Sequence, residues 1–236
     1  WSYIDIHGNW TSPWIRSTAG LTDVAHKNGV TVGTLMSIPF GNSVYLTSWR
    51  SDVYSRVLFR LTQKSGDKYL YAEPLVRMMK YYGINGIGFN SEFRTSSSVM
   101  TQLSEFFVAC HKEAEKLNWK FEVHWYDGTS DDGQIHFDGG LSYHNQKIFG
   151  DKDNIATDML FANYNWGPGH LSASVNTAKR LGRSSFDYYA GFDIQGRGLR
   201  QASWSALLDN DISIGFWGAH KQSLIHQSAT DNGTSD

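Results

Sequence analysis

Residues 82–93, which read YGINGIGFNSEF, decide the fold prediction. The middle of this stretch is apolar and glycine-rich, which is typical of a short strand buried on both faces. The stretch then continues to Asn90 and Glu92, and residues two apart in a strand point to the same face of a sheet. An amide and a carboxyl group are therefore predicted side by side at the carboxyl end of a buried strand, where parallel α/β folds bind ligands. Glu92, close to apolar Phe89 and Phe93, is a candidate proton donor; a polar strand end that only hydrates a loop is the alternative.

Strands and helices are predicted to alternate along the rest of the chain. Further strands are expected at residues 2–7, 31–38, 120–127, 156–166, 187–195 and 211–218. Apolar residues at helical spacing predict helices at residues 15–27, 52–63, 69–82, 98–117, 170–181 and 202–208. This alternation without an obvious linker favours a single parallel sheet.

The predicted fold class is α/β, a (β/α)₈ TIM barrel with the eighth strand missing from this chain. The barrel is expected over residues 1–227 and a polar tail over residues 228–236. A doubly wound sheet is the alternative, but no Gly-x-Gly-x-x-Gly turn opens an early helix. Polar and aromatic residues follow nearly every expected strand, as the ring of loops at one end of a barrel requires.

The composition excludes several classes of function. The 236 residues carry a formal net charge of −2, which gives no electrostatic footprint for nucleic acid. Cys110 is the only cysteine, so neither an intrachain disulfide nor a cysteine metal cluster can form. No window is long and apolar enough to span a bilayer. A secreted or cell-surface bacterial protein is favoured over a cytosolic one, and the oligomeric state is left open.

Polar and aromatic side chains gather at the ends of the expected strands. They are Asp5, His7, Asn90, Glu92, His124, Trp125, Tyr126, Asp127, Asn163, Tyr164, Asn165, Trp166, Asp193, Gln195, Arg197, Trp217 and His220. The carboxyl ends of parallel strands meet at one end of a barrel, so these groups are expected to form one rim. Aromatic faces mixed with polar groups around one carboxyl suit the binding of a sugar.

Other chemistries have weaker support in the sequence. His124 with Asp127, or Asp5 with His7, could bind a metal ion, but there is no His-Glu-x-x-His run or other His/carboxylate cluster at ligand spacing. A Ser-His-Asp hydrolase would need a Gly-x-Ser-x-Gly turn, which does not occur. We therefore expect neither a catalytic metal nor a cofactor.

Five short segments, in order along the chain, carry a resemblance to a known family. They are AHKNGVTVGT (residues 25–34), NSE (90–92), WYD with a following DG (125–127 and 132–133), NYNW (163–166) and GFDIQGRG (191–198). Together they resemble the catalytic barrel of glycoside hydrolase family 85, the endo-β-N-acetylglucosaminidases. Each segment is weak alone, but five in the right order are specific.

The resemblance implies roles for the matched residues. Glu92 would be the general acid/base, Asn90 would hold the 2-acetamido group of the substrate, and Tyr126 would hydrogen-bond near the reacting centre. Trp166 would line the sugar site, and Phe137 stands where the family usually has a tryptophan. Together with the strand-end positions, these matches predict substrate contacts from Trp166, Asn163, Phe137, His124, Trp125, Asp193 and Trp217.

The reaction implied by the resemblance is hydrolysis of the β-1,4 bond between the two GlcNAc residues in the core of N-linked glycans and glycoproteins. It would be a retaining, substrate-assisted reaction through an oxazolinium intermediate, with transglycosylation as a further activity. A family 18 chitinase-like enzyme is one alternative, although Asn85, Gly88 and Asn90 stand where that family has aspartates. A non-catalytic glycan-binding barrel is the other alternative.

Overall fold

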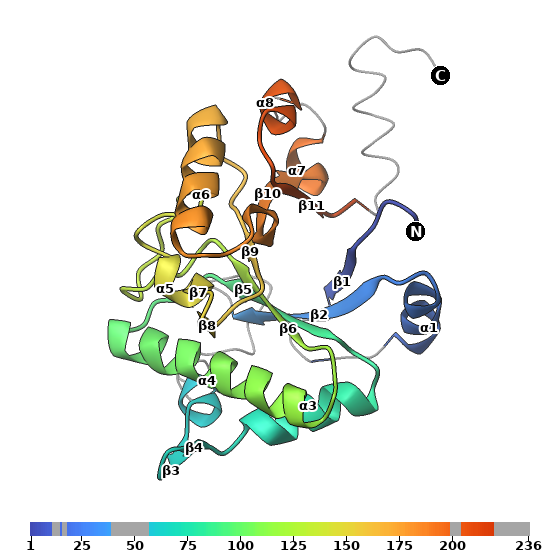
Figure 1. Cartoon of the computed structure of the whole chain (residues 1–236), viewed down its shortest axis with the longest axis vertical. Coiled ribbons are helices and arrows are strands. Elements are labelled where there is room, and N and C mark those ends of the chain that lie inside the picture. The colour runs from blue at the N-terminus through green and yellow to red at the C-terminus, as the bar shows by residue number, and fades with distance from the viewer. Residues whose placement is uncertain (11–14, 16–17, 39–56, 199–203, 220–236) are drawn as a thin grey trace.

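The computed structural model of the chain describes all residues except 11–14, 16–17, 39–56, 199–203 and 220–236. Its main sheet has seven parallel strands in the order β1-β2-β5-β6-β9-β10-β11. The strands are β1 (Ile6–Trp10), β2 (Thr31–Ile38), β5 (Gly86–Ser91), β6 (Glu122–Tyr126), β9 (Met159–Phe161), β10 (Tyr188–Asp193) and β11 (Ser213–Trp217). The sheet curls into a half-barrel (Figure 1). The predicted α/β barrel fold is confirmed in this partial form.

Helices flank the curled sheet on its outer face (Figure 1). They are α1 (Ala19–Lys27), α3 (Ala72–Tyr81), α4 (Ser97–Lys116), α5 (Gln146–Phe149), α6 (Pro168–Arg180), η2 (Ser185–Asp187), α7 (Ile194–Arg197) and α8 (Trp204–Leu208). The long helix α4 follows β5 directly, and the Ser96 hydroxyl accepts a hydrogen bond from the backbone N–H of Val99 at its start. Pro168 begins α6, at a position where the missing N–H has no cost.

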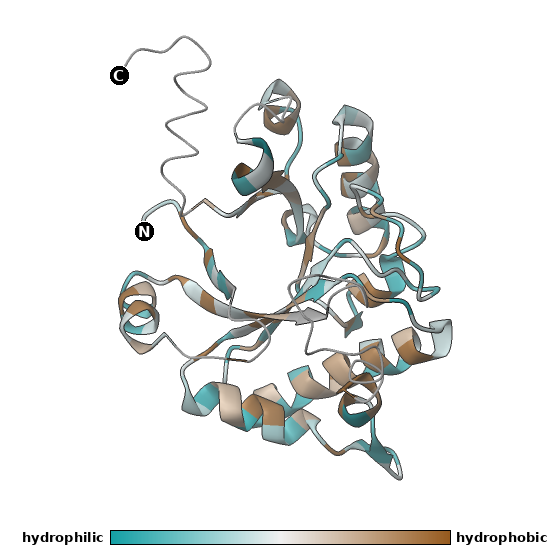
Figure 2. Cartoon of the chain, turned by 180° about the vertical axis from the view of Figure 1, so that it is seen from behind, coloured by the Kyte–Doolittle hydropathy of each residue, from teal (hydrophilic) through white to brown (hydrophobic). Residues whose placement is uncertain are grey.

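The hydrophobic core lies between the sheet and the helices. Every second residue of β5 and β6 faces outward, and Phe89 and Trp125 are at most 1% exposed. The ring of Phe89 packs against Phe107 of α4, with centroids 5.1 Å apart. Hydrophobic residues lie along α4 and along the strands of the main sheet (Figure 2). The alternate side chains, among them Asn90 and Tyr126, consequently point into the barrel.

Two antiparallel hairpins interrupt the predicted order of elements. β3 (Lys64–Ser65) pairs with β4 (Lys68–Tyr69), and α3 therefore begins at Ala72 rather than at residue 69. β7 (Gly150–Asp151) pairs with β8 (Asn154–Ile155). The strand predicted over residues 156–166 is reduced to the three residues of β9, because residues on either side of it serve hairpin and loop contacts.

Other boundaries shift by a few residues. β1 covers Ile6–Trp10 instead of residues 2–7, and α1 begins at Ala19 instead of residue 15. The tail predicted over residues 228–236, and much of the helix predicted over 52–63, lie outside the described residues. Within the described part of the chain, none of the helices has the length and apolar character needed to cross a membrane.

Candidate active site

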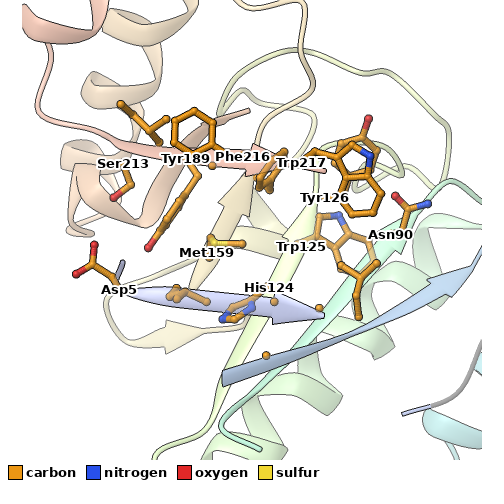
Figure 3. A pocket seen from close by; sticks show the side chains of 18 of the residues that line it. Asp5, Asn90, His124, Trp125, Tyr126, Met159, Tyr189, Ser213, Phe216 and Trp217 are labelled. Carbon is orange, nitrogen blue, oxygen red and sulfur yellow. The ribbon is translucent and has the colours of Figure 1, made fainter. Parts of the chain in front are cut away.

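A cavity of about 810 Å³ lies inside the curled sheet. Predicted site residues from several strands line it: Asn90, Glu92, His124, Tyr126, Asp193 and Trp217. In Figure 3, Asn90 and Tyr126 lie toward one end of the cavity and Asp5 lies toward the other. The ends of strands that are far apart in the sequence therefore meet at one place, as a barrel requires.

Asn90 and Glu92 lie side by side at the end of β5. The side-chain Nδ2 of Asn90 donates a hydrogen bond to Oε2 of Glu92 over 2.9 Å. Ser91, between them, points to the opposite face, where its fully buried hydroxyl donates to the carbonyl oxygen of Tyr126 over 2.7 Å. The alternation of side chains along a strand is therefore what brings the amide and the carboxylate together.

Tyr126, on β6, is the next polar side chain of this end of the cavity. Burial, and then the neighbouring Glu92 carboxylate, raise the pKa of Tyr126, so its hydroxyl stays protonated. The Nδ2 of Asn163 donates to the hydroxyl oxygen of Tyr126 over 2.8 Å. Since that oxygen already accepts a hydrogen bond from Asn163, Tyr126 can direct its own proton into the cavity.

Tyr164 and Asp193 complete the polar end of the cavity, and both line it. Burial raises the pKa of Tyr164 most, followed by the charges of Tyr126 and Asp193. Asp193 caps the start of α7, where its Oδ1 accepts the backbone N–H of Gly196 over 2.8 Å. Tyr164 was expected in the rim of strand ends and belongs to the NYNW segment, although it was not singled out as a substrate contact.

The buried carboxylate of Asp127 fixes the backbone around the site. Its Oδ2 accepts the backbone N–H groups of Gly139 and Asn163 over 2.6 and 3.2 Å. Its Oδ1 accepts Nδ2 of Asn145 over 3.1 Å. Burial raises the pKa of Asp127 to about 7 despite these donors. Asp127 therefore holds the loop after β6 and the end of β9 in place.

Phe137 lies in the loop that Asp127 holds. Its backbone φ is 50°, which is uncommon for a residue other than glycine. Its ring centroid lies 6.1 Å from that of Tyr126. The structure thus brings Phe137 next to the site, as its sequence position indicated.

The indole N–H groups of Trp125 and Trp166 both donate hydrogen bonds to backbone carbonyl oxygens. Trp125 borders the cavity, but it is 0% exposed, packs its ring in the core, and donates from Nε1 to the carbonyl oxygen of Thr129 over 3.1 Å. The Nε1 of Trp166 donates to the carbonyl oxygen of Gly191 over 2.7 Å. Trp125 is therefore packed in the core at the wall of the cavity, and half-buried Trp166 is not among the residues that line the cavity. The sugar contacts expected from both stay predictions. Phe93 is also buried in the core rather than beside the carboxyl of the site.

His124 lies deeper in the cavity, two residues before Tyr126 on the same face of β6. Its Nε2 lies 3.0 Å from Oε2 of Glu122, and Nζ of Lys120 lies 2.8 Å from Oε1 of the same carboxylate. Burial alone would raise the pKa of Glu122, but the hydrogen bonds from His124 and Lys120 lower it to about 2. His124 is therefore paired with Glu122 and not with Asp127. The possible pair of metal ligands formed by His124 and Asp127 is thus not present.

The chain resembles known proteins in both sequence and fold. The sequence profile of glycosyl hydrolase family 85 matches residues 1–229. The chain is 28% identical over 205 residues to a cytosolic endo-β-N-acetylglucosaminidase of Gallus gallus, covering 84% of this chain and 25% of that protein. It is 28% identical over 193 residues to cytosolic endo-β-N-acetylglucosaminidase 1 of Arabidopsis thaliana, covering 81% of this chain and 25% of that protein.

Solved structures give the same picture of the fold. The glycoside hydrolase domain of Endo-D from Streptococcus pneumoniae R6 superposes with a TM-score of 0.79 at 25% identity, over 92% of this chain and 34% of that one. A family 18 chitinase from Crocus vernus superposes with a TM-score of 0.50 at 13% identity, over 92% of this chain and 76% of that one, which is a likeness of fold alone.

These relatives also correct one prediction. The preference for a secreted or cell-surface bacterial protein is wrong, because the curated relatives are named as cytosolic enzymes and come from vertebrates and Arabidopsis thaliana. The chain spans about a quarter of the length of those relatives. Since the family profile covers residues 1–229, this chain belongs to glycosyl hydrolase family 85.

Proposed function

We propose that this chain hydrolyses the β-1,4 bond between the two GlcNAc residues in the core of N-linked glycans. The observation that carries the proposal is the hydrogen-bonded pair of Asn90 and Glu92 at the cavity end of β5. Family membership and the names of the curated relatives support the choice of substrate.

The pairing of an amide with a carboxylate favours a substrate-assisted reaction. Retaining glycosidases with an enzyme nucleophile need two carboxylates about 5–5.5 Å apart. Here the group hydrogen-bonded to Glu92 is the amide of Asn90, which cannot act as that nucleophile. The acetamido oxygen of the substrate can attack the anomeric carbon instead, as in the families that are exceptions to the two-carboxylate rule.

The proposed reaction has two steps. In the first, the acetamido oxygen bonds to the anomeric carbon, the glycosidic bond breaks, and Glu92 gives its proton to the departing oxygen. The product is an oxazolinium ion, and in this proposal Asn90 and the Tyr126 hydroxyl orient the acetamido group. In the second step, Glu92 takes a proton from water, the water oxygen bonds to the anomeric carbon, and the ring opens with retention. A sugar hydroxyl in place of the water would give transglycosylation.

The experiment that tests this proposal is incubation of the protein with an N-glycosylated glycopeptide, followed by mass spectrometry. We expect a peptide that keeps one GlcNAc, and no such product from Glu92→Gln, which preserves the shape of Glu92 but removes its proton transfer. Glu115→Gln, on the exposed face of α4, is the matched control and should leave the product unchanged.

The possible results separate the proposal from its alternatives. Binding of the glycopeptide without any product would favour a glycan-binding barrel. Cleavage that persists in Glu92→Gln would contradict the role given to Glu92. Release of free chitobiose from chitin oligosaccharides, with the glycopeptide left intact, would favour a chitinase-like enzyme instead.

A further inference from the structure

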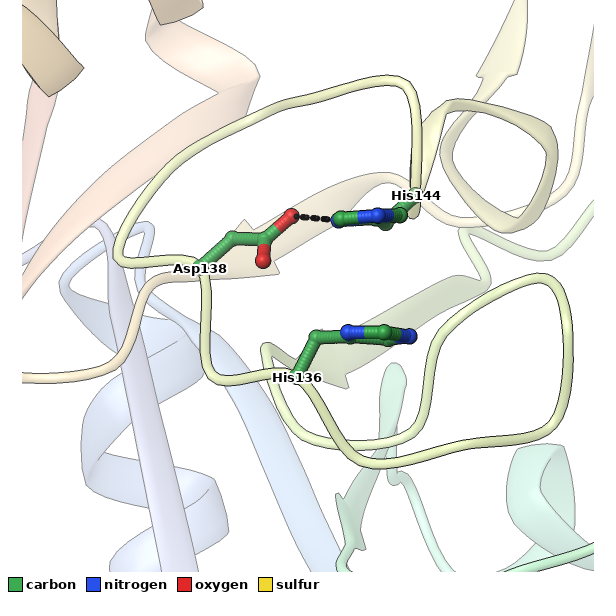
Figure 4. Close-up of side chains that lie close together, drawn as sticks. All are labelled: His136, Asp138 and His144. Atoms are coloured by element: carbon green, nitrogen blue, oxygen red, sulfur yellow. Dashed lines mark hydrogen bonds and ion pairs between the residues drawn. The ribbon is translucent and has the colours of Figure 1, made fainter.

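The loop between β6 and α5 brings two histidines and an aspartate together outside the cavity described above. The possible ligand atoms of His136, Asp138 and His144 all lie within 4.8 Å of one another. The two imidazole rings stack with centroids 4.1 Å apart and planes 7° from parallel, and Asp138 lies beside them (Figure 4). In the part of the chain that the structure describes, this is the one group of three such side chains at metal-binding distance.

Two of these side chains are held by a further polar contact outside the cluster. The Nε2 of His136 lies 3.0 Å from Oδ2 of Asp132. The carboxylate thereby favours the proton on Nε2 and leaves the Nδ1 lone pair of His136 for a ligand. Asp138 accepts a hydrogen bond from the hydroxyl of Ser142. Outer partners of this kind are typical of metal sites, where they fix the tautomer of histidine and the orientation of carboxylates.

We propose that His136, Asp138 and His144 bind one divalent transition-metal ion, with Zn²⁺ as the best match. Two imidazole nitrogens and one carboxylate oxygen are ligands that zinc accepts, and three protein ligands leave a fourth position for water. The site needs no cysteine, and Cys110 is fully buried away from it.

The ion would take the place of the proton between His144 and Asp138. The Nδ1 of His144 now lies 2.8 Å from Oδ2 of Asp138. Two ligands of a tetrahedral zinc ion lie roughly 3.3 Å apart, so a small widening of this pair is enough. The ring of His136 must also tilt out of the stack, because the lone pairs of parallel rings do not converge on one point. His136 is exposed and can make that movement.

An ion at this site would act on the loop that carries Phe137, whose ring lies near Tyr126 of the cavity. Phe137 stands between the ligands His136 and Asp138 in the sequence, and its backbone φ is 50°. Cross-linking residues 136, 138 and 144 would fix Phe137 beside Tyr126. The site is therefore structural, and it stands apart from the reaction proposed above.

The test is direct binding of Co²⁺ and Zn²⁺ to the purified, metal-stripped protein. We expect one Co²⁺ per chain with the visible absorption of a tetrahedral nitrogen–oxygen site, displaced by one equivalent of Zn²⁺. Zn²⁺ at a hundredfold excess over Kd should raise the melting temperature by roughly 5–10 °C. These readouts do not depend on glycosidase activity.

Two variants and a control assign the binding to this cluster. His136→Ala leaves the Asp138–His144 pair intact and should fold normally, yet it should weaken Co²⁺ binding at least tenfold; Asp138→Asn should do the same. His170→Ala, which removes an exposed histidine at the start of α6, should bind Co²⁺ like the parent. Absence of Co²⁺ and Zn²⁺ binding at millimolar concentration, or binding that survives His136→Ala unchanged, would overturn the proposal.

Discussion

The side-chain amide of Asn163 donates a hydrogen bond to the hydroxyl oxygen of Tyr126 over 2.8 Å, while its own Oδ1 is buried without a partner. The amide nitrogen rather than the oxygen therefore faces the tyrosine, and it occupies one acceptor position of that hydroxyl. The direction in which Tyr126 donates is thus decided by a residue of the neighbouring strand end. Asn163 is a positioning residue, since it acts on the substrate through Tyr126.

The first prediction concerns the direction of this hydrogen bond, in which Asn163 donates and Tyr126 accepts. Asn163→Ala should lower kcat about tenfold with little change in KM, because Tyr126 loses the partner that orients it. Asn163→Asp should lower kcat further, because a carboxylate would accept the tyrosine proton and draw it away from the cavity. Steady-state kinetics on the glycopeptide measure both, and Asn154→Ala, in the exposed strand β8, is the control. Equal rates for Asn163→Asp and the parent would refute the role.

The second prediction concerns Asn90. Asn90→Ala removes the hydrogen bond of 2.9 Å to Glu92 and the proposed contact to the acetamido group. Misplaced reacting groups cost about 100-fold in rate, and we expect a loss of that size in glycopeptide hydrolysis. A preformed sugar oxazoline bypasses the first step, so its use should fall much less. Comparable losses with both substrates would argue against the positioning role.

The strand that carries Asn90 shows what the sequence could predict. Its apolar, glycine-rich run predicted a short buried strand within residues 82–93, where β5 lies, and the alternation of side chains predicted the Asn90–Glu92 pair. Both follow from local pattern, because a buried parallel strand has a periodicity of two and an apolar composition. The convergence of several strand ends on one cavity followed from the barrel fold.

The tryptophans show where the pattern was insufficient. Trp125 lies near the end of β6 and Trp166 follows β9, as sugar-binding aromatics do, but each indole N–H donates to a backbone carbonyl within the protein. Which face a large ring packs against depends on neighbours that are distant in the sequence, such as Phe107 on α4 for Trp125. The cluster of His136 and His144 was missed for the same reason, because loop geometry brings these residues together and their spacing alone does not.

The third prediction tests the packing at the deep end of the cavity. A Cβ at Gly86 would lie 2.6 Å from Cε1 of His124, whereas a Cβ at Gly8 would meet nothing within 4 Å. Gly86→Ala should therefore displace the buried imidazole and lower the free energy of unfolding by about 1–3 kcal/mol. Gly8→Ala, on β1, should change it by less than about 0.5 kcal/mol. Urea denaturation measures the difference.

A double variant shows whether His124 is the cause. If the clash with the imidazole is responsible, Gly86→Ala should cost little in a background that already carries His124→Ala, because the ring is gone. The two changes would then be strongly non-additive. Additive losses would mean that the glycine is required for the strand backbone rather than for the histidine.

The fourth prediction concerns acid stability. The hydrogen bonds from His124 and Lys120 hold the pKa of Glu122 at about 2, below its ordinary value of 4.5. A carboxyl whose pKa is lowered by folding stabilises the protein above its unfolded pKa, and this contribution is lost as the pH falls through the folded pKa. The contribution of Glu122 should therefore be complete near pH 5 and should disappear between about pH 4.5 and pH 2.

Glu122→Gln isolates this contribution from those of the other carboxylates. Near pH 6 the variant should unfold with a free energy about 3 kcal/mol lower than that of the parent, which is the size expected from the shift of pKa. The difference should shrink steadily as the pH is lowered from 4.5 to 2, because protonated glutamic acid and glutamine then pair with His124 in similar ways. Chemical denaturation across this pH range measures the two curves, and Glu115→Gln on the exposed face of α4 is the control. A difference that stays constant down to pH 2 would mean that Glu122 acts through its shape and not through its charge.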